Sequence, residues 1–154
     1  MDAASSTSKK RSAASWLSRL PKPPVFFLDR SLGKLKVAVA LRSAGVTLEI
    51  HDDHFPPDAP DESWLKAAGE KRWVVLTKDQ NIRFHTREKA ALVSYNVQAF
   101  VLTAGALSGD EMAEIFVGAL DEVAKVLSKN NSGFVATVSR GGMVRIVWPP
   151  SHSS

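Results

Sequence analysis

Two apolar runs in the chain are each followed closely by an aspartate. Val25–Leu28 (VFFL) ends at Asp29, and Trp73–Thr77 (WVVLT) is followed by Lys78 and Asp79. The length of these runs and their β-branched and aromatic content predict strands buried on both faces. Carboxylates that come directly after such strands lie at the carboxyl edge of the sheet, where open α/β folds bind their ligands.

Strand and helix patterns alternate along the chain, which predicts an α/β fold with a mainly parallel sheet. The spacing predicts strands at 25–28, 46–50, 73–77, 98–103, 134–139 and 143–148, and helices at 32–43, 61–72, 86–95 and 108–129. The last two strands flank a Gly-Gly turn and are expected to form a C-terminal β-hairpin. Ser108 and Glu111 have the spacing of a capping box, and Gly45 is expected to end the first helix.

The composition is that of an ordinary globular domain, and it excludes several kinds of site. Hydrophobic residues make up 44% and charged residues 23% of the 154 residues, enough for one domain with a substantial core. No apolar run approaches the ~20 residues of a membrane helix. The absence of cysteine excludes disulfides, thiolate–zinc sites and cysteine nucleophiles, and it is consistent with a cytoplasmic protein.

The net charge of +4 is concentrated at the N-terminus. Residues 1–24 contain five basic side chains and one acidic side chain, so the other 130 residues hold 15 of each and are neutral. We interpret residues 1–24 as a basic, disordered arm that ends in a proline-rich spacer. Attraction to nucleic acid is expected from this arm or from a local patch. Trp16, Leu17 and Leu20 provide apolar positions for docking, while the Ser-rich, acid-poor composition is also typical of an organelle-targeting peptide.

Acidic residues are predicted to converge on the carboxyl edge of the sheet. Asp29 and Asp79 follow two strands, and Asp61 with Glu62 opens the helix upstream of the second of these strands. Carboxylate oxygens are the ligands that Mg²⁺ and Mn²⁺ prefer, and such ions support the hydrolysis of phosphodiesters. The amide of Asn81 is expected to add a weaker oxygen ligand. The sequence therefore predicts a divalent-metal site at this edge.

Each of these acids also has a purely structural interpretation. Asp29 would cap the following helix, although Ser31 is better placed to do so. Asp79 would form an Asx turn, and Asp61 would be the N-cap of its helix with Glu62 complementing the helix dipole.

Other polar residues surround the expected site. The segment His51–His54 (HDDH) is predicted to be a solvated loop in which Asp52 or Asp53 faces the sheet edge, and without cysteine it is not expected to hold structural zinc. Basic side chains near the expected site are Arg30, Arg83, Arg87 and Lys89. The last three either form a solvated face or, beside an acidic metal site, bind phosphate, and Arg30 is also expected to bind phosphate.

Several short motifs, in this order and at these spacings, resemble the PIN-like domain family related to VapC toxins. They are Phe27-Leu28-Asp29-Arg30, Leu32-Gly33, His51 to Phe55, Pro60 to Leu65, Val74 to Asp79, Ile82-Arg83, Ala99 to Leu102 and Met112-Ala113-Glu114. The resemblance covers about residues 25–148 and leaves out the arm.

The resemblance implies a three-layer α/β/α sandwich over residues 25–150 and a Mg²⁺- or Mn²⁺-dependent endoribonuclease, with an antitoxin and a second copy of the chain as expected partners. By position, Asp29, Asp61 and Asp79 match the catalytic acids of the family. Asn81 stands where many members have a fourth acid, and Glu62 or Glu88 is expected to compensate. Hydrolysis would leave a 5′-phosphate and a 3′-hydroxyl.

Other classes of α/β protein with acids at strand ends fit less well. A receiver-type phosphoacceptor domain needs paired acids after the first strand and a lysine after the last parallel strand, and a dehalogenase-type phosphatase needs Asp-x-Asp where this chain has Asp29-Arg30-Ser31. A module that binds RNA or a partner without cleaving is the remaining alternative, which Asn81 and the neutral body favour.

Overall fold

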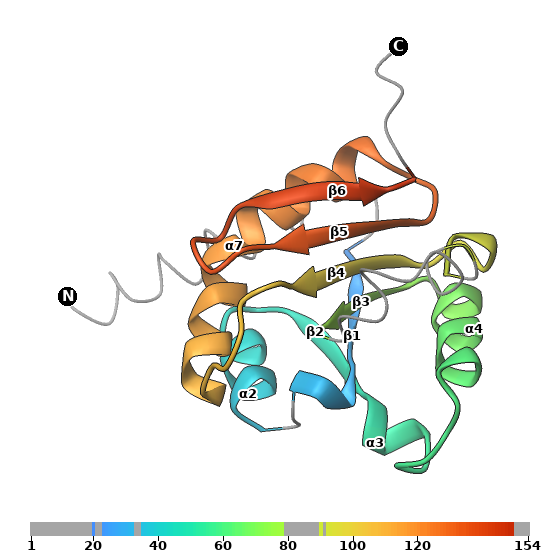
Figure 1. The fold of residues 1–154 in the computed structure, drawn as a ribbon, viewed down its shortest axis with the longest axis horizontal. Coiled ribbons are helices and arrows are strands. Elements are labelled where there is room, and N and C mark those ends of the chain that lie inside the picture. The colour runs from blue at the N-terminus through green and yellow to red at the C-terminus, as the bar shows by residue number, and fades with distance from the viewer. Residues whose placement is uncertain (1–19, 21–22, 33–34, 79–89, 91, 150–154) are drawn as a thin grey trace.

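Six strands form a single sheet in the order β2-β1-β3-β4-β5-β6 (Figure 1). The computed structural model describes residues 20, 23–32, 35–78, 90 and 92–149. The strands are β1 (Val25–Leu28), β2 (Thr47–Ile50), β3 (Trp73–Thr77), β4 (Gln98–Leu102), β5 (Phe134–Val138) and β6 (Val144–Trp148). All neighbours are parallel except β5 and β6, which form an antiparallel hairpin. The predicted α/β fold, with its mainly parallel sheet and C-terminal hairpin, is confirmed.

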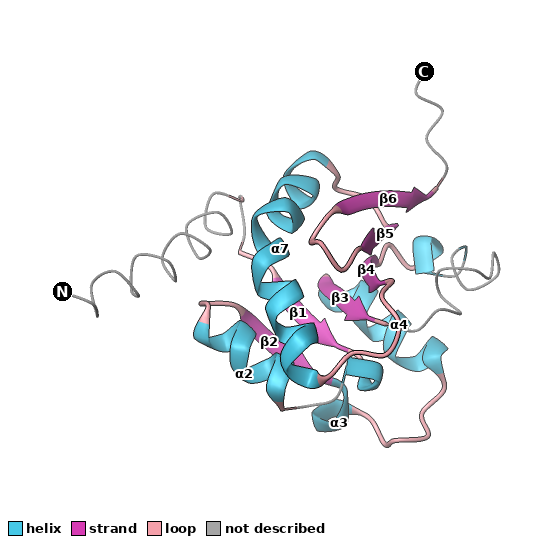
Figure 2. Ribbon diagram, turned by 60° about the vertical axis from the view of Figure 1, so that its left-hand side comes forward, coloured by secondary structure: helices cyan, strands magenta, loops and turns pink. Residues whose placement is uncertain are grey.

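Helices cover both faces of the sheet (Figure 2). On one face lie α2 (Lys36–Ser43) and α7 (Gly109–Lys129), and on the other lies α4 (Asp61–Lys71). Phe26 and Leu28 of β1 belong to the buried cluster beneath α2 and α7, whereas Phe27 belongs to the cluster beneath α4. Because successive side chains of a strand point to opposite faces, a strand covered on both sides is apolar throughout, as VFFL is.

The order of the strands reverses at β1. From β1 the chain crosses to β2 on one side and then returns to β3 on the other, so β1 pairs in parallel with both. In open α/β sheets such a switch point leaves a crevice at the carboxyl ends of the two central strands. Asp29 follows β1 directly, so this carboxylate lies at the switch point.

Two segments next to the sheet differ from the prediction. The first helix begins at Lys36 rather than at residue 32, because Arg30–Leu32 forms a separate 3₁₀ turn, η1. The prediction of a solvated loop at His51–His54 was wrong: these residues form one helical turn, α3. The turn is held because the His51 side chain is buried and its carbonyl accepts a hydrogen bond from Phe55 N. Residues 86–89 and 91 of the predicted helix 86–95 lie outside the described residues, and residues 90 and 92–94 are helical.

The predicted helix-end signals are present. Gly45 has a φ of 93°, and the amides of Gly45 and Val46 close the end of α2 on the carbonyls of Arg42 and Leu41. Ser108 and Glu111 form the capping box at the start of α7. Among the described residues, none of the helices is long and apolar enough to cross a bilayer.

The capping box makes the stability of α7 sensitive to acid. The Ser108 amide donates to the Glu111 carboxylate at 2.9 Å, and this bond, with a smaller effect of the Ser108 side chain, holds the pKa of this carboxyl below its usual value. A lowered folded-state pKa stabilises the fold at neutral pH, and this contribution is lost as the pH falls through that pKa. We therefore expect the stability advantage of the wild type over Glu111→Gln to shrink between pH 7 and pH 3 in urea titrations. The exposed Glu122→Gln in the same helix is the control, and an identical pH dependence for the two variants would contradict the prediction.

Two helical glycines provide a matched test of packing. A Cβ at Gly69 of α4 would collide with the backbone oxygen of Tyr95, whereas a Cβ at Gly118 of α7 would meet nothing within 4 Å. Gly69→Ala is therefore expected to cost about 1–3 kcal/mol, as overpacking does. Gly118→Ala is expected to stabilise by about 0.5–1 kcal/mol, because alanine loses less backbone entropy in a helix. Urea unfolding of both variants checks the opposite signs, and destabilisation by Gly118→Ala would contradict this account.

Candidate active site at the carboxyl edge of the sheet

The Asp29 carboxylate lies at the end of β1 and is almost completely buried, with 7% of the residue exposed. Its Oδ2 accepts two hydrogen bonds, from Thr77 Oγ1 at 2.7 Å and from Ser31 Oγ at 2.8 Å. Its Oδ1 accepts no hydrogen bond from the described part of the chain. One oxygen is thus held by two hydroxyl donors, and the other has no hydrogen-bond donor among the described residues.

Hydrogen bonds join the ends of β1 and β3 around this carboxylate. The Asp29 amide donates to Leu76 O at 3.0 Å, which extends the ladder between the two strands by one residue. Ser31 Oγ accepts from Lys78 N at 2.9 Å. Since Lys78 directly precedes Asp79, these bonds fix the backbone up to the residue before the second predicted acid.

The helix-capping interpretation of Asp29 and Ser31 is not what the structure shows. The residue at the N-cap of α2 is Leu35, and no side chain caps that helix end. Ser31 instead donates to the Asp29 carboxylate and accepts from the amide after β3. Both side chains therefore belong to the sheet edge.

The other predicted acids are placed only in part. Asp61 is the first residue of α4, and Pro60 rather than Asp61 is the N-cap. Because α4 connects the parallel strands β2 and β3, it begins at the carboxyl edge, the edge on which Asp29 lies. Glu62 is exposed in the first turn of the same helix. The predicted site residues Asp79, Asn81, Arg83 and Glu88 lie outside the described residues.

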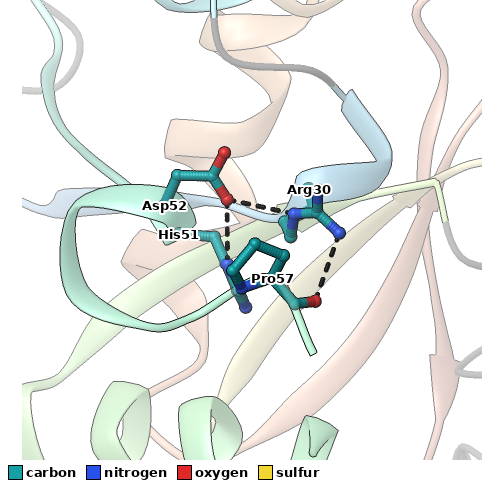
Figure 3. A network of polar contacts seen from close by, with 4 residues as sticks. All are labelled: Arg30, His51, Asp52 and Pro57. Atoms are coloured by element: carbon teal, nitrogen blue, oxygen red, sulfur yellow. Dashed lines mark hydrogen bonds and ion pairs between the residues drawn. The ribbon is translucent and has the colours of Figure 1, made fainter. Parts of the chain in front are cut away.

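Arg30, which follows Asp29 in the chain, is held by the segment after β2 (Figure 3). Its Nε donates to Asp52 Oδ1 at 3.0 Å, and its Nη1 donates to Pro57 O at 3.2 Å. The Arg30 side chain nevertheless remains 47% exposed. We predicted that Asp52 or Asp53 would face the carboxyl edge of the sheet. Asp52 pairs with Arg30, the residue that follows Asp29 at the end of β1.

His51 was not recognised from the sequence as part of the core. Its ring is 2% exposed and lies 5.5 Å from Phe55 and 6.1 Å from Phe27, measured between centroids. Its Nδ1 is 3.4 Å from the same Asp52 oxygen that pairs with Arg30. The available signal was the position of His51 directly after a strand and four residues before Phe55, the spacing of a helical turn.

The described side chains do not by themselves complete a cation site. No three of the described His, Asp or Glu side chains lie close enough together to hold a metal ion. Asp29 nevertheless fits such an ion, because it offers a buried anionic oxygen whose partner oxygen is fixed by two hydroxyl donors. Hard divalent cations prefer oxygen ligands of this kind. The Asp29 carboxylate is therefore compatible with Mg²⁺ or Mn²⁺ as a ligand.

A doubly covered parallel sheet with a buried carboxylate at its switch point defines an α/β protein with a candidate acidic metal site. The family described as "PIN like domain" matches residues 24–104, which is more than half of the chain. The chain therefore belongs to the PIN-like domain family. This match includes β1 to β4 and every acid predicted for the site.

A Mycobacterium tuberculosis protein described as "Putative ribonuclease VapC45" is 26% identical to this chain over 125 residues. The alignment covers 79% of this chain and 90% of that protein. No solved structure matches the chain. The alignment with the mycobacterial protein is longer than the segment 24–104 that matches the family, so this similarity extends beyond that segment.

Proposed function

We propose that this protein is a Mg²⁺- or Mn²⁺-dependent endoribonuclease whose active site is the carboxyl edge between β1 and β3. The buried Asp29 carboxylate carries the proposal, because two hydroxyls fix one of its oxygens and leave the other open. Membership of the PIN-like domain family and the similarity to the mycobacterial protein support the same activity.

In this proposal Asp29, Asp61 and Asp79 hold the metal, with Asn81 and Glu62 as weaker contributors. A bound divalent ion supplies a nucleophilic water and stabilises the charge that develops on the phosphate. Ser31 and Thr77 orient Asp29 through hydrogen bonds to Oδ2.

Arg30 and Arg83 hold substrate phosphates in this proposal. Arg30 follows Asp29 in the chain, and its contacts with Asp52 and Pro57 hold its guanidinium while leaving part of the side chain exposed. A guanidinium held next to a metal site is suited to bind the charged oxygens of a phosphodiester.

The proposed substrate is RNA, and the proposed biological role is that of a toxin in a toxin–antitoxin pair. The similarity to a protein named as a VapC ribonuclease supports this role. The partners in this proposal are a cognate antitoxin and a second copy of the chain, and the proposed compartment is the cytoplasm.

The test is cleavage of a mixed single-stranded RNA pool by the full chain with Mn²⁺ or Mg²⁺, beside a sample treated with EDTA. We expect cleavage with metal and none after chelation. Cleavage that survives EDTA would refute a metal-dependent nuclease. RNA binding without cleavage in either metal would support the non-catalytic module instead.

Thr77→Val tests the role assigned to the hydroxyls, because valine keeps the shape of threonine and removes the donor to Asp29. Loss of a hydrogen bond that orients a metal ligand commonly weakens binding about 10- to 100-fold, and we expect a loss of Mn²⁺ affinity in this range. Calorimetric titration with Mn²⁺ measures it. Thr103→Val is the matched control at the end of β4, where the hydroxyl faces Val138 O. Equal affinities for the two variants would remove this role from Thr77.

A further inference from the structure

An open groove of about 770 Å³ runs between α2 and α7 on the outer surface of the protein. Its lining is mostly small or apolar: Ala40 and Ser43 of α2, Ala44 at the end of that helix, and Ala113, Val117 and Gly118 of α7. The acids Asp110 and Glu114 line the same groove. The lining is therefore mostly small and apolar, and of its two acids Asp110 is paired with Lys36 of α2 at 3.2 Å, which leaves Glu114 as the acid without such an ion pair among the described residues.

The surface near the groove also carries exposed apolar side chains and a further acid. Val39 of α2 and Leu35, the N-cap residue of that helix, are 55% and 66% exposed. Asp121 is exposed on α7, seven residues and two helical turns beyond Glu114, and lies on the same helical face. A segment that fills this groove must bring apolar side chains flanked by positive charge.

Residues 9–19 of the chain have this composition. They contain Lys9, Lys10, Arg11 and Arg19, no acid, and the apolar pair Trp16-Leu17. The arm also starts in the right place: Leu20 packs against the cluster beneath α2 and α7, and it lines a cavity together with Leu127 near the end of α7.

The arm is long enough to reach the groove from there. Leu127 and Asp110 are 17 residues apart on α7, or roughly 25 Å at the helical rise. The nine residues from Leu20 back to Arg11 span roughly 30 Å when extended. An arm that runs back along α7 therefore places Trp16 and Leu17 near Gly118 and the cluster Lys9–Arg11 near the acids at the start of the helix.

We propose that residues 9–19 dock in the groove between α2 and α7 of their own chain. Trp16 and Leu17 fill the apolar floor, and the basic side chains lie beside Glu114 and Asp121. The acids disfavour RNA as the occupant. They also disfavour a symmetric contact with a second copy, which would set the acidic face of one α7 against that of the other. This proposal is independent of the nuclease activity.

Engineered disulfides test the docking in the full chain, because the protein contains no cysteine of its own. Gly118→Cys places a thiol in the groove, where a Cβ meets nothing within 4 Å. It is paired in turn with Ser12→Cys, Ser15→Cys and Ser18→Cys, so that the exact register of the arm does not decide the result. The control thiol is Lys66→Cys, which is exposed on α4 across the sheet (Figure 2).

With one of the arm cysteines, we expect the disulfide within one chain to form at least about ten times faster to residue 118 than to residue 66, because docking raises the effective concentration. The double substitution Glu114→Lys with Asp121→Lys should remove most of this difference, as should 0.5 M salt. Equal rates to residues 118 and 66 for all three arm positions would overturn the proposal. A disulfide between two chains, forming at a rate that rises with protein concentration, would overturn it in favour of a second copy.

Discussion

Asp29→Asn is expected to abolish metal-dependent RNA cleavage, with a loss of at least about a hundredfold. The substitution keeps the size of the side chain and removes the negative charge from the oxygen that is open to a ligand. Loss of residues that merely orient metal ligands costs 10- to 100-fold, so loss of a ligand's charge should cost at least as much. Cleavage rates at saturating Mn²⁺, together with calorimetric Mn²⁺ titration, measure the effect.

The matched control for this prediction is Asp121→Asn, which makes the same chemical change at an exposed position of α7. It should cleave RNA at the wild-type rate. Urea unfolding of both variants shows whether the fold is intact. A folded Asp29→Asn protein that cleaves within a few-fold of the wild-type rate would exclude Asp29 from the metal site and remove the observation on which the proposed function rests.

Phe27→Ala is expected to destabilise the protein by about 3–5 kcal/mol, the usual cost of removing a buried aromatic ring. Phe27 is completely buried, and its ring stacks on Trp64 and Trp73 with centroid distances of 5.5 and 5.3 Å. A loss of this size is a large part of the 5–15 kcal/mol by which most domains are stable. The midpoint of urea unfolding should fall while the slope of the transition stays the same.

Phe27→Leu provides the comparison, since leucine keeps most of the apolar volume and loses only the stacked ring. We expect it to cost clearly less than the alanine variant. A cost below about 1 kcal/mol for Phe27→Ala would show that the cluster beneath α4 repacks freely, and it would contradict the close packing inferred from the ring geometry.

The sheet could be predicted from the sequence because β1 and β3 are apolar runs of ordinary strand length next to helical patterns, and β5 and β6 flank a Gly-Gly turn. The order of the strands was not predicted, since the switch at β1 depends on which strands pair. The start of α2 was missed because Ser31 looks like an N-cap, whereas its hydroxyl bonds to Asp29 and Lys78. The helical turn at His51–His54 was missed because a run of four polar residues resembles a loop. Contacts that bury His51 also come from residues distant in sequence, such as Phe27 and Trp64.

Of the predicted acidic site, the structure describes the surroundings of Asp29. Asp29 could be found because it interrupts an apolar pattern at the end of a strand. The role of Thr77 could not be derived in the same way, since a threonine at the end of a strand is common and its donation to Asp29 joins residues that are 48 positions apart. The pairing of Arg30 with Asp52 could not be predicted either, because these residues are far apart in the sequence and meet only when the segments after β1 and β2 pack together.

The hydrogen bond from the Asp29 amide to Leu76 O has a consequence for how the site responds to an ion. Local opening of a protein usually begins at loops and chain ends, and the centre of a sheet opens only with global unfolding. The Asp29 backbone is part of that centre, so its carboxylate keeps its place whether or not a cation is present. For the proposed nuclease, we therefore expect that removing the ion stops cleavage without unfolding the protein, in contrast to small zinc domains that unfold when their metal is removed.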